Sequence, residues 1–309
     1  MLATLLRVEN LCVHFPQSNE PTIREVSFDL KRGQKTALLG ESGCGKSLTA
    51  LAFLRLLPPR FRATGRAWLG EELDLLQLSE DEIRALRGRR IVLIPQGGMT
   101  YLNPVFTIGY QIDEALRRVG VVAPRPRRAK MLELMARVGL PDPPRLARLY
   151  PHELSGGMAQ RVLLAAGMAG QPDLVIADEP TRGLDEDVKM SCIAVLKDVY
   201  RDAAILLITH DFQVAATCES LIVMYAGEIV EAGPTAIVLS HPVHPYTRGL
   251  LASLPQNGLW PIPGQPPSML HPPAGCRFHP RCTMAAEVCS QFTPSLVVRG
   301  GVARRCFFA

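Results

Sequence analysis

The sequence lacks the long hydrophobic runs that cross membranes. Its 309 residues contain no uninterrupted apolar stretch of about 18 residues, which excludes a membrane-spanning domain fused within this chain. The first residues lead directly into a strand-like hydrophobic pattern and carry no features of a secretory signal peptide. These two absences predict a cytoplasmic protein.

Strong charge and long repeats are also absent. The net charge of +5 is a mild excess of positive charge. No long heptad tract occurs, and the glycine-rich phosphate-binding motif described below occurs once. One basic run, Arg125–Lys130, has the charge to contact anionic lipid or nucleic acid. Such a run is more often the solvated surface of a helical segment, so we expect no nucleic-acid partner.

One glycine-rich stretch indicates a binding site. It matches the pattern Gly-x-x-x-x-Gly-Lys-Ser of loops that cradle the phosphates of a nucleoside triphosphate. Glycine allows backbone N–H groups to curl around phosphate oxygens. We expect Lys46 to reach the β- and γ-phosphates and the Ser47 hydroxyl to hold Mg²⁺. The predicted cradle consists of Gly40, Glu41, Ser42, Gly43, Cys44, Gly45, Lys46 and Ser47.

The flanks of this loop have the pattern that the motif requires. Residues 35–39 predict a short buried strand, and residues 47–57 predict an apolar helix whose positive end faces the phosphates. A glycine-rich turn that matches by chance is the alternative, and it does not account for strand, loop and helix in this order. Cys44, close to the helix N-terminus, is expected to carry an unusually acidic and reactive thiol.

A second hydrophobic strand ends in two carboxylates. Residues 174–179 read Leu-Val-Ile-Ala-Asp-Glu. Asp178 at the strand end suits the Mg²⁺ shell, and Glu179 suits the general base that polarises the attacking water. A strand that ends in acid for solubility is the alternative, but it is less compatible with a phosphate loop in the same chain.

These motifs, in this order, resemble the ATP-binding cassette superfamily over residues 5–255. The resemblance implies that the Phe15 ring stacks on adenine, with a core phenylalanine as the alternative. It implies that Gln96, after the strand at 91–94, touches Mg²⁺ and the attacking water. It makes His210, which ends the strand at 206–210, the sensor of the γ-phosphate, with a buried core histidine as the alternative.

The stretch Leu-Ser-Gly-Gly resembles the signature motif of that superfamily at Ser155, Gly156 and Gly157. These residues open a helix whose positive end suits a γ-phosphate, which in the family lies on the opposite subunit. Asp185 ends the stretch Gly-Leu-Asp that resembles the family's D-loop. The resemblance therefore implies two cassettes that close head to tail over two ATP molecules.

Further stretches resemble the ATPase subunits of dipeptide, oligopeptide and nickel importers: residues 99–104, Met158, and His-Pro-Tyr-Thr-Arg-Gly-Leu-Leu at 244–251. The resemblance implies that the chain lies at the cytoplasmic face of the inner membrane and drives the uptake of a peptide-like solute or metal chelate. Its partners would be an extracytoplasmic binding protein, two membrane permease subunits and a second, paralogous ATPase. A soluble cassette that clamps nucleic acid and an export ATPase without its membrane domain are the competing classes.

The composition changes after residue 254. Seven prolines fall between Pro255 and Pro273, which predicts an extended tether. Half of the eight cysteines follow it, separated by five, six and sixteen residues: Cys276, Cys282, Cys289 and Cys306. Disulfides are disfavoured in a reducing cytoplasm, and zinc sites usually contain Cys-x-x-Cys. Because the segment resembles peptide-importer ATPases, some of which carry a [4Fe–4S] cluster, we expect such a cluster, with zinc or free thiols as alternatives.

These observations predict the α/β fold of an ATP-binding cassette, with a phosphate-loop core sheet and an antiparallel strand region near the N-terminus. We expect a nucleotide-binding domain at 1–254 with a helical subdomain inserted at about 97–165. We expect a proline-rich tether and cysteine-rich region at 255–309, so small that a metal would contribute much of its folding free energy.

Overall fold

The computed structural model describes residues 3–16, 18, 20–121 and 123–308. Their contacts divide the chain into two compact units. Unit 1 comprises Ala3, Lys31–Lys35 and Ser79–Leu207, and unit 2 comprises the described parts of 4–30, 36–78 and 208–308. Each unit has a buried core of aliphatic side chains, and each carries a different share of the sequence motifs.

The strands of unit 1 have the order β8-β7-β6. β6 (Ile91–Ile94) and β7 (Leu174–Asp178) run parallel, with Ile91 opposite Leu174. β8 (Ala204–Thr209), which belongs to unit 1 up to Leu207, is buried along its whole length. Continuous apolar strands are typical of sheets covered on both faces. Because β6 and β7 are parallel, the residues that follow them lie at one edge of the sheet.

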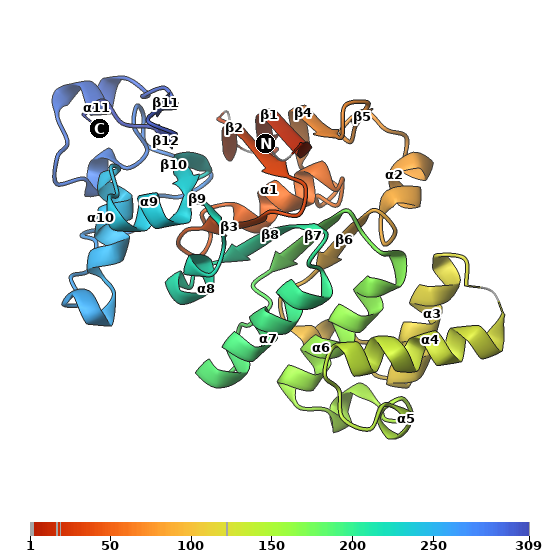
Figure 1. Cartoon of the computed structure of the whole chain (residues 1–309). Helices are drawn as coiled ribbons and strands as arrows, with labels where there is room; N and C mark the ends of the chain where they lie inside the picture. The colour runs from red at the N-terminus through yellow and green to blue at the C-terminus, as the bar shows by residue number, and fades with distance from the viewer. Residues whose placement is uncertain (1–2, 17, 19, 122, 309) are drawn as a thin grey trace. The chain divides into compact units, whose positions relative to one another are not determined.

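Helices occupy most of the chain between β6 and β7, drawn in yellow and green in Figure 1. The buried residues Ile108, Ile112 and Leu116 form one face of α3, and α3, α4 and α6 pack against one another. The helices of unit 1 are α2 (Glu80–Leu86), α3 (Ile108–Arg118), α4 (Pro124–Arg137), α5 (Pro143–Leu146), α6 (Gly156–Gly167) and α7 (Glu186–Val199), with 3₁₀ turns η1 (Gly98–Tyr101), η2 (Pro151–Glu153) and η3 (Met168–Gly170).

The basic run lies on α4 and is mostly exposed, as expected. Arg127 is the exception: it is 9% exposed and forms an ion pair with Asp113 of α3, which also accepts from Arg117. Burial favours the neutral form of Asp113, but hydrogen bonds from the two arginines outweigh it and lower the pKa of that carboxyl. One member of the run therefore contributes to helix packing.

Unit 2 contains a sheet with the order β2-β1-β4-β5. β1 (Thr4–His14) pairs antiparallel with β4 (Arg62–Leu69), and Leu6 lies opposite Leu69. β2 (Ile23–Lys31) and β5 (Leu73–Asp74) are the outer strands. The antiparallel region predicted near the N-terminus is therefore present.

A second group of strands in unit 2 has the order β11-β12-β10-β9-β3. β3 (Lys35–Leu39) runs parallel to β9 (Ser220–Tyr225), which is antiparallel to β10 (Glu228–Pro234). The strand predicted at 35–39 is confirmed. The helix predicted at 47–57 is shorter, because α1 (Lys46–Phe53) ends before Arg55, whose φ of 54° is left-handed, and two prolines follow at 58–59.

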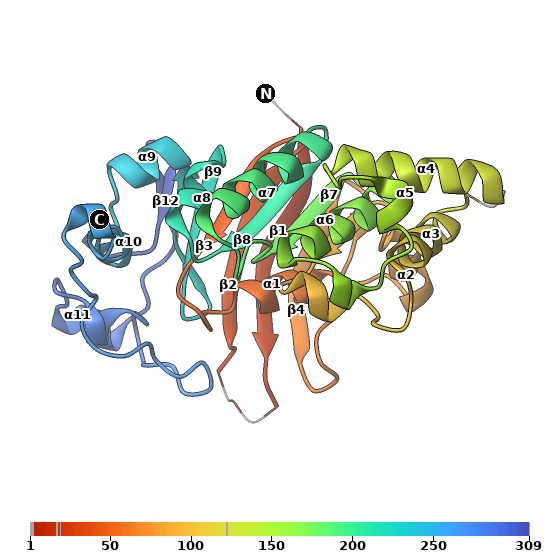
Figure 2. The same cartoon turned by 90° about the horizontal axis from the view of Figure 1, so that it is seen from below.

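The C-terminal segment joins this second sheet. β12 (Val302–Arg304), labelled in Figure 2, pairs antiparallel with β10, and β11 (Val297–Arg299) pairs with β12 (Figure 1). These strands were not predicted from the sequence, since three-residue strands have too little pattern to recognise. The remaining elements of unit 2 are α8 (Phe212–Ala216), α9 (Thr235–Ser240), α10 (Pro245–Ala252) and α11 (Glu287–Gln291), with 3₁₀ turns η4 (Pro255–Asn257) and η5 (His279–Arg281).

Over the residues that the structure describes, no helix is both long enough and apolar enough to cross a membrane.

Candidate nucleotide site and cysteine cluster

The phosphate loop connects β3 to α1 in unit 2. Gly45 caps α1 with a φ of 105°, which glycine adopts without strain. Lys46 is 5% exposed, and its Nζ donates to the carbonyl oxygens of Gly40 at 2.8 Å and Glu41 at 3.0 Å. The loop therefore curls around the lysine that the sequence assigns to the phosphates. Ser42 and Gly43 are exposed at its outer side.

Two glycines of the loop are required for different reasons. A Cβ on Gly40 would lie 2.3 Å from the carbonyl oxygen of Met224 and 2.7 Å from the Cys44 sulfur, so strand β9 leaves no room for a side chain. Among the residues that the structure describes, a Cβ on Gly43 would meet nothing within 4 Å, but the φ of Gly43 is +79°. Gly40 thus serves packing against β9, whereas Gly43 serves the backbone turn.

The expectation of an acidic thiol at Cys44 is wrong. Cys44 is 6% exposed, and burial raises the pKa of its thiol to about 11, although Lys46 works in the opposite direction. The helix N-terminus and the lysine favour the thiolate, but removal from water disfavours it more strongly. Cys44 is therefore a small buried residue of the loop.

Phe15 and His210 also lie in unit 2. Phe15 directly follows β1, is half-buried, and has its ring centroid 5.0 Å from that of Phe61. It is therefore one member of an aromatic pair beyond the strand end. His210 directly follows β8 and is exposed. The alternative of a buried core histidine does not apply to it.

The two carboxylates lie at the end of β7 in unit 1. Asp178 is the last residue of the strand and is half-buried. Glu179 follows with a φ of 46°, in the left-handed region that non-glycine residues rarely adopt. Strained backbone of this kind is typical of functional sites. Glu179 therefore leaves the extended path of β7 immediately after Asp178.

Gln96 follows β6, at the same sheet edge as Asp178, because β6 and β7 are parallel. Its side chain lies beside Arg182, and its amide oxygen can accept from that guanidinium. Two predicted residues of the nucleotide chemistry, Gln96 and Asp178, are thus brought to one edge of unit 1.

The signature motif lies at the start of α6, in unit 1. Ser155 is the N-cap, and its hydroxyl accepts from the N–H of Met158 at 3.3 Å. Ser155 and Gly156 are exposed, whereas a Cβ on Gly157 would lie 3.0 Å from Val188 of α7. Asp185 is the N-cap residue of α7 and is exposed as well. The signature motif and the Gly-Leu-Asp stretch therefore lie at the N-terminal ends of α6 and α7, two helices that pack against each other.

The four C-terminal cysteines line one small cavity of only about 10 Å³ in unit 2, together with Phe278 and His244: Cys276, Cys282, Cys289 and Cys306. Two of the sulfurs accept backbone N–H groups, that of Cys282 from Met284 at 3.4 Å and that of Cys306 from Phe308 at 3.5 Å. Four cysteines that are separated in the sequence therefore line the same cavity.

The same cluster does not have the arrangement of a formed metal site. Among the described residues, no group of three or more His, Cys, Asp or Glu side chains is arranged to hold a metal ion. Burial raises the pKa of the Cys276 thiol to about 11 and raises that of Cys282 as well. A metal would have to displace these protons. The expected iron–sulfur cluster or zinc ion is therefore not supported by the side-chain geometry.

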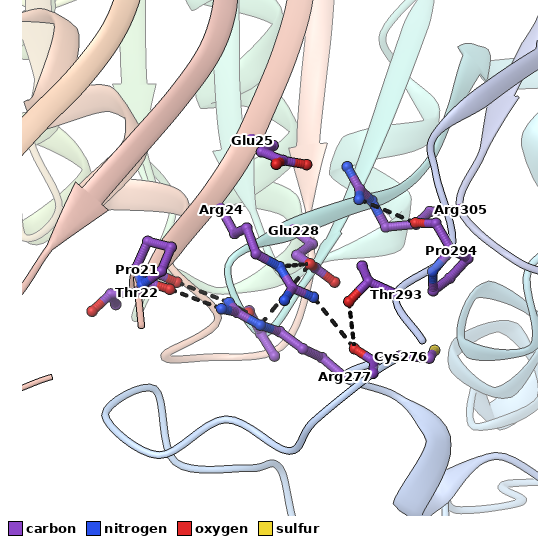
Figure 3. Close-up of polar contacts among 12 residues, drawn as sticks. Pro21, Thr22, Arg24, Glu25, Glu228, Cys276, Arg277, Thr293, Pro294 and Arg305 are labelled. Atoms are coloured by element: carbon purple, nitrogen blue, oxygen red, sulfur yellow. Dashed lines mark hydrogen bonds and ion pairs between the residues drawn. The ribbon is translucent and has the colours of Figure 1, made fainter. Parts of the chain in front are cut away.

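Two arginines beside these cysteines were missed by the sequence analysis. Arg277 is 1% exposed and donates to the carbonyl oxygens of Pro21 at 2.8 Å and Thr22 at 3.2 Å (Figure 3). Arg24 pairs with Glu228 in the same cluster. Burial lowers the pKa of Arg277 to about 10, which Glu228 counteracts. For Arg277 the available signal in the sequence was the stretch Cys-Arg-Phe-His-Pro-Arg-Cys, in which it directly follows the first cysteine.

Comparisons with known proteins agree with these features. Residues 23–182 match the profile of the ABC transporter family, and residues 230–289 match the C-terminal region of oligopeptide/dipeptide transporters. A dipeptide transport ATP-binding protein of Bacillus subtilis is 41% identical, over 96% of this chain and 91% of that protein. A probable D,D-dipeptide transport ATP-binding protein of Escherichia coli is 40% identical, over 99% and 96%.

A solved structure has the same fold. It is a dimeric ATP-binding cassette in a post-hydrolysis state with ADP and phosphate, 25% identical, with a TM-score of 0.64 over 74% of this chain and 98% of that one.

The fold and the phosphate loop define a P-loop ATPase of the cassette class, and the predicted fold class is confirmed. The chain belongs to the ABC transporter family, as an ATP-binding subunit that couples ATP hydrolysis to transport.

Proposed function

We propose that this chain is the ATPase subunit of an importer for di- or oligopeptides or a similar solute, such as nickel or another metal chelate. The observation that carries this proposal is the match to two profiles in one chain, the cassette at 23–182 and the peptide-transporter C-terminal region at 230–289. The names of the relatives, which are dipeptide and peptide transport proteins, point to the same solute class. The division into a cassette at 1–254 and a tether with a cysteine-rich region at 255–309 is part of the proposal.

The phosphate loop binds the triphosphate of ATP. Backbone N–H groups of the loop donate to phosphate oxygens, and Lys46 exchanges its bonds to loop carbonyls for bonds to the β- and γ-phosphates. Phe15 offers a ring for adenine to stack on. The enclosed lysine and the exposed outer side of the loop support this assignment. The assigned loop residues are Gly40, Glu41, Ser42, Gly43, Cys44, Gly45, Lys46 and Ser47.

The catalytic groups act at the γ-phosphate. Bound Mg²⁺ would neutralise phosphate charge, and Ser47, Gln96 and Asp178 have the oxygen donors that it prefers. Glu179 takes the proton of the attacking water as general base. His210, exposed after β8, holds the γ-phosphate and the water in place.

The second half of each site comes from another ATPase subunit. Ser155, Gly156 and Gly157 would face the γ-phosphate held by that partner, and Asp185 would contact it nearby. The exposed N-terminus of α6 supports this role. The proposed partner is a paralogue, and the pair works with two permease subunits and an extracytoplasmic binding protein at the cytoplasmic face of the membrane.

Reconstitution tests this function. The chain, its companion ATPase and the permease subunits are placed in vesicles, and ATP hydrolysis is measured with a dipeptide-loaded binding protein. We expect hydrolysis to rise and dipeptide to accumulate. Stimulation by nucleic acid without a membrane partner would instead favour the clamp class, and efflux would favour an exporter.

We also propose that the four C-terminal cysteines hold a metal, a [4Fe–4S] cluster or alternatively zinc. Four thiols around one cavity, two of them with backbone donors, have the chemistry of such a ligand set, although the side chains would have to converge on the metal. Iron, acid-labile sulfide and zinc are measured per chain after anaerobic purification. About four irons and four sulfides, lost in Cys282→Ser, would establish a cluster. One zinc would make the segment a structural clip, and no metal would contradict the proposal.

A further inference from the structure

Glu41, the second residue of the phosphate loop, is held from three directions. Its carboxylate accepts two hydrogen bonds from Arg281, at 2.8 Å from Nη1 to Oε2 and at 3.1 Å from Nη2 to Oε1. Its N–H donates to the Tyr246 hydroxyl at 3.0 Å, and its carbonyl accepts from Lys46 at 3.0 Å. Side chain and backbone of one loop residue are therefore both fixed.

Two of these contacts come from the C-terminal part of the chain. Tyr246 lies in α10 and is 0% exposed, and Arg281 lies in η5, directly before Cys282. They are 205 and 240 residues away from Glu41 in the sequence. The C-terminal region thus contacts the first turn of the phosphate loop.

Arg281 has little freedom to move. Its side chain is 5% exposed, against 24% for that of Glu41. Its Nε donates to the carbonyl oxygen of Pro263 at 2.9 Å, and its guanidinium carbon lies 5.8 Å from the centre of the Tyr225 ring. The tether, β9 and the loop therefore fix the guanidinium together. A bidentate pair formed by such a preorganised arginine is both strong and specific in direction.

Because Glu41 is negatively charged, its ion pair with Arg281 affects how the loop binds a phosphate ligand. A loop that receives a polyphosphate has a negative residue in its second position, and an unpaired carboxylate there would repel the phosphates. Arg281 neutralises that carboxylate and also restrains the backbone carbonyl that holds Lys46. Loss of the arginine would leave the loop with a free negative charge and one restraint fewer.

We propose that Arg281 is a positioning residue for the phosphate loop, which acts through Glu41 and makes the affinity for ATP depend on the C-terminal region. This inference rests on the proposed nucleotide site. Arg281 does not touch the reacting atoms, so its loss should change the binding of ATP and leave the chemical step almost unaltered.

The test compares ATP affinity in wild type, Arg281→Ala, Glu41→Gln and the double variant Glu41→Gln/Arg281→Ala. We expect Arg281→Ala to raise the Kd for ATP about tenfold and to raise KM with kcat nearly unchanged. The double variant should return to within about threefold of Glu41→Gln, because no unpaired carboxylate remains. A purely structural arginine would show no such recovery.

Two further variants complete the design. Arg248→Ala removes the same charge from an exposed position in α10, where Arg248 donates to the carbonyl oxygen of Pro242, and should leave the Kd unchanged. Arg281→Lys keeps the charge without the fork and should fall between wild type and Arg281→Ala. It also carries the test if Arg281→Ala does not fold.

Two results would overturn the inference: an unchanged Kd in both Arg281 variants, or a double variant as weak as Arg281→Ala. Absence of ATP binding in the wild type itself, at the level of Lys46→Ala, would instead overturn the proposed function.

Discussion

Unit 2 surrounds its phosphate loop with contacts from its own chain, whereas unit 1 leaves its signature motif exposed. Lys46 is 5% exposed and bonded to loop carbonyls, and Glu41 is held by two residues of the C-terminal region. Ser155 and Asp185 are exposed at the N-terminal ends of α6 and α7. The contrast indicates that one motif is preorganised by the chain itself, while the other is available to a partner.

The glycines of the two motifs also differ in how closely the chain itself packs around them. Gly40 has no room for a side chain, because β9 packs against it. Gly156 is exposed, and of the described part of the chain a Cβ there would contact only Leu184, at an ordinary 3.5 Å. The loop glycine is thus required by the fold of this chain, whereas the fold does not require the signature glycine, as expected if a partner approaches it. The following predictions test this contrast.

The largest effect is expected at the end of β7. Glu179→Gln removes the proposed general base and keeps the size of the side chain, so ATP hydrolysis by the assembled complex should fall by about 10²–10⁴-fold, while ATP binding persists. Phosphate release and ATP binding are measured together, and size-exclusion chromatography with ATP should show a trapped cassette pair. Normal turnover in this variant would remove Glu179 from the role of base.

A somewhat smaller loss is expected at the signature motif. Ser155→Asp keeps an effective N-cap for α6 but places a negative charge where the partner's γ-phosphate is proposed to bind. Hydrolysis by the complex should fall about 100-fold, with the thermal stability of the chain unchanged. Ser79→Asp, at the N-cap of α2, is the matched control and should keep full activity. Wild-type hydrolysis in Ser155→Asp would contradict an exposed, partner-facing motif.

The two loop glycines should differ in stability. Gly40→Ala forces a Cβ against a backbone carbonyl at 2.3 Å and should lower the free energy of unfolding by about 3 kcal/mol. Gly43→Ala meets open space and pays only for its left-handed backbone, about 1 kcal/mol. Urea unfolding of both variants measures the difference. Equal losses would show that packing against β9 does not restrict Gly40.

An effect no larger than that of Gly40→Ala is expected in the helices of unit 1. Asp113→Asn deprives the buried Arg127 of its carboxylate and should cost about 1.5–3 kcal/mol at pH 7. Because the folded pKa of Asp113 is lowered, its contribution is complete well above pH 4 and disappears as the pH falls through that lower pKa. Urea unfolding should therefore show a smaller difference in stability between wild type and Asp113→Asn at pH 3 than at pH 7.

Glu114→Gln, which breaks the exposed pair with Arg118 on the same helix, is the control and should change stability by less than about 0.5 kcal/mol. A pH-independent difference for Asp113→Asn would contradict the ion-pair account.

The sequence predicted the local parts of this molecule and missed the long-range ones. Strands at 35–39 and 91–94 were recognised because buried parallel strands are short apolar runs. The contact between Glu41 and Arg281 spans 240 residues, and no local pattern indicates it. The acidity expected for Cys44 was wrong because a motif shows neighbouring charges but not burial, and burial decides this pKa.

The positive φ of Glu179 was also beyond the sequence, since the residue type gives no sign of it. The four cysteines were grouped correctly by their proximity in sequence, yet the cavity that they line depends on β12 joining β10.

The most direct test of the central contrast is equilibrium ATP binding to the purified chain alone, in wild type, Lys46→Ala and Ser155→Asp. If the phosphate loop is completed within the chain and the signature motif serves a partner, Lys46→Ala loses ATP binding and Ser155→Asp binds with wild-type affinity. If Ser155→Asp weakens ATP binding by the isolated chain as much as Lys46→Ala does, the assignment of the signature motif to a partner's nucleotide is wrong.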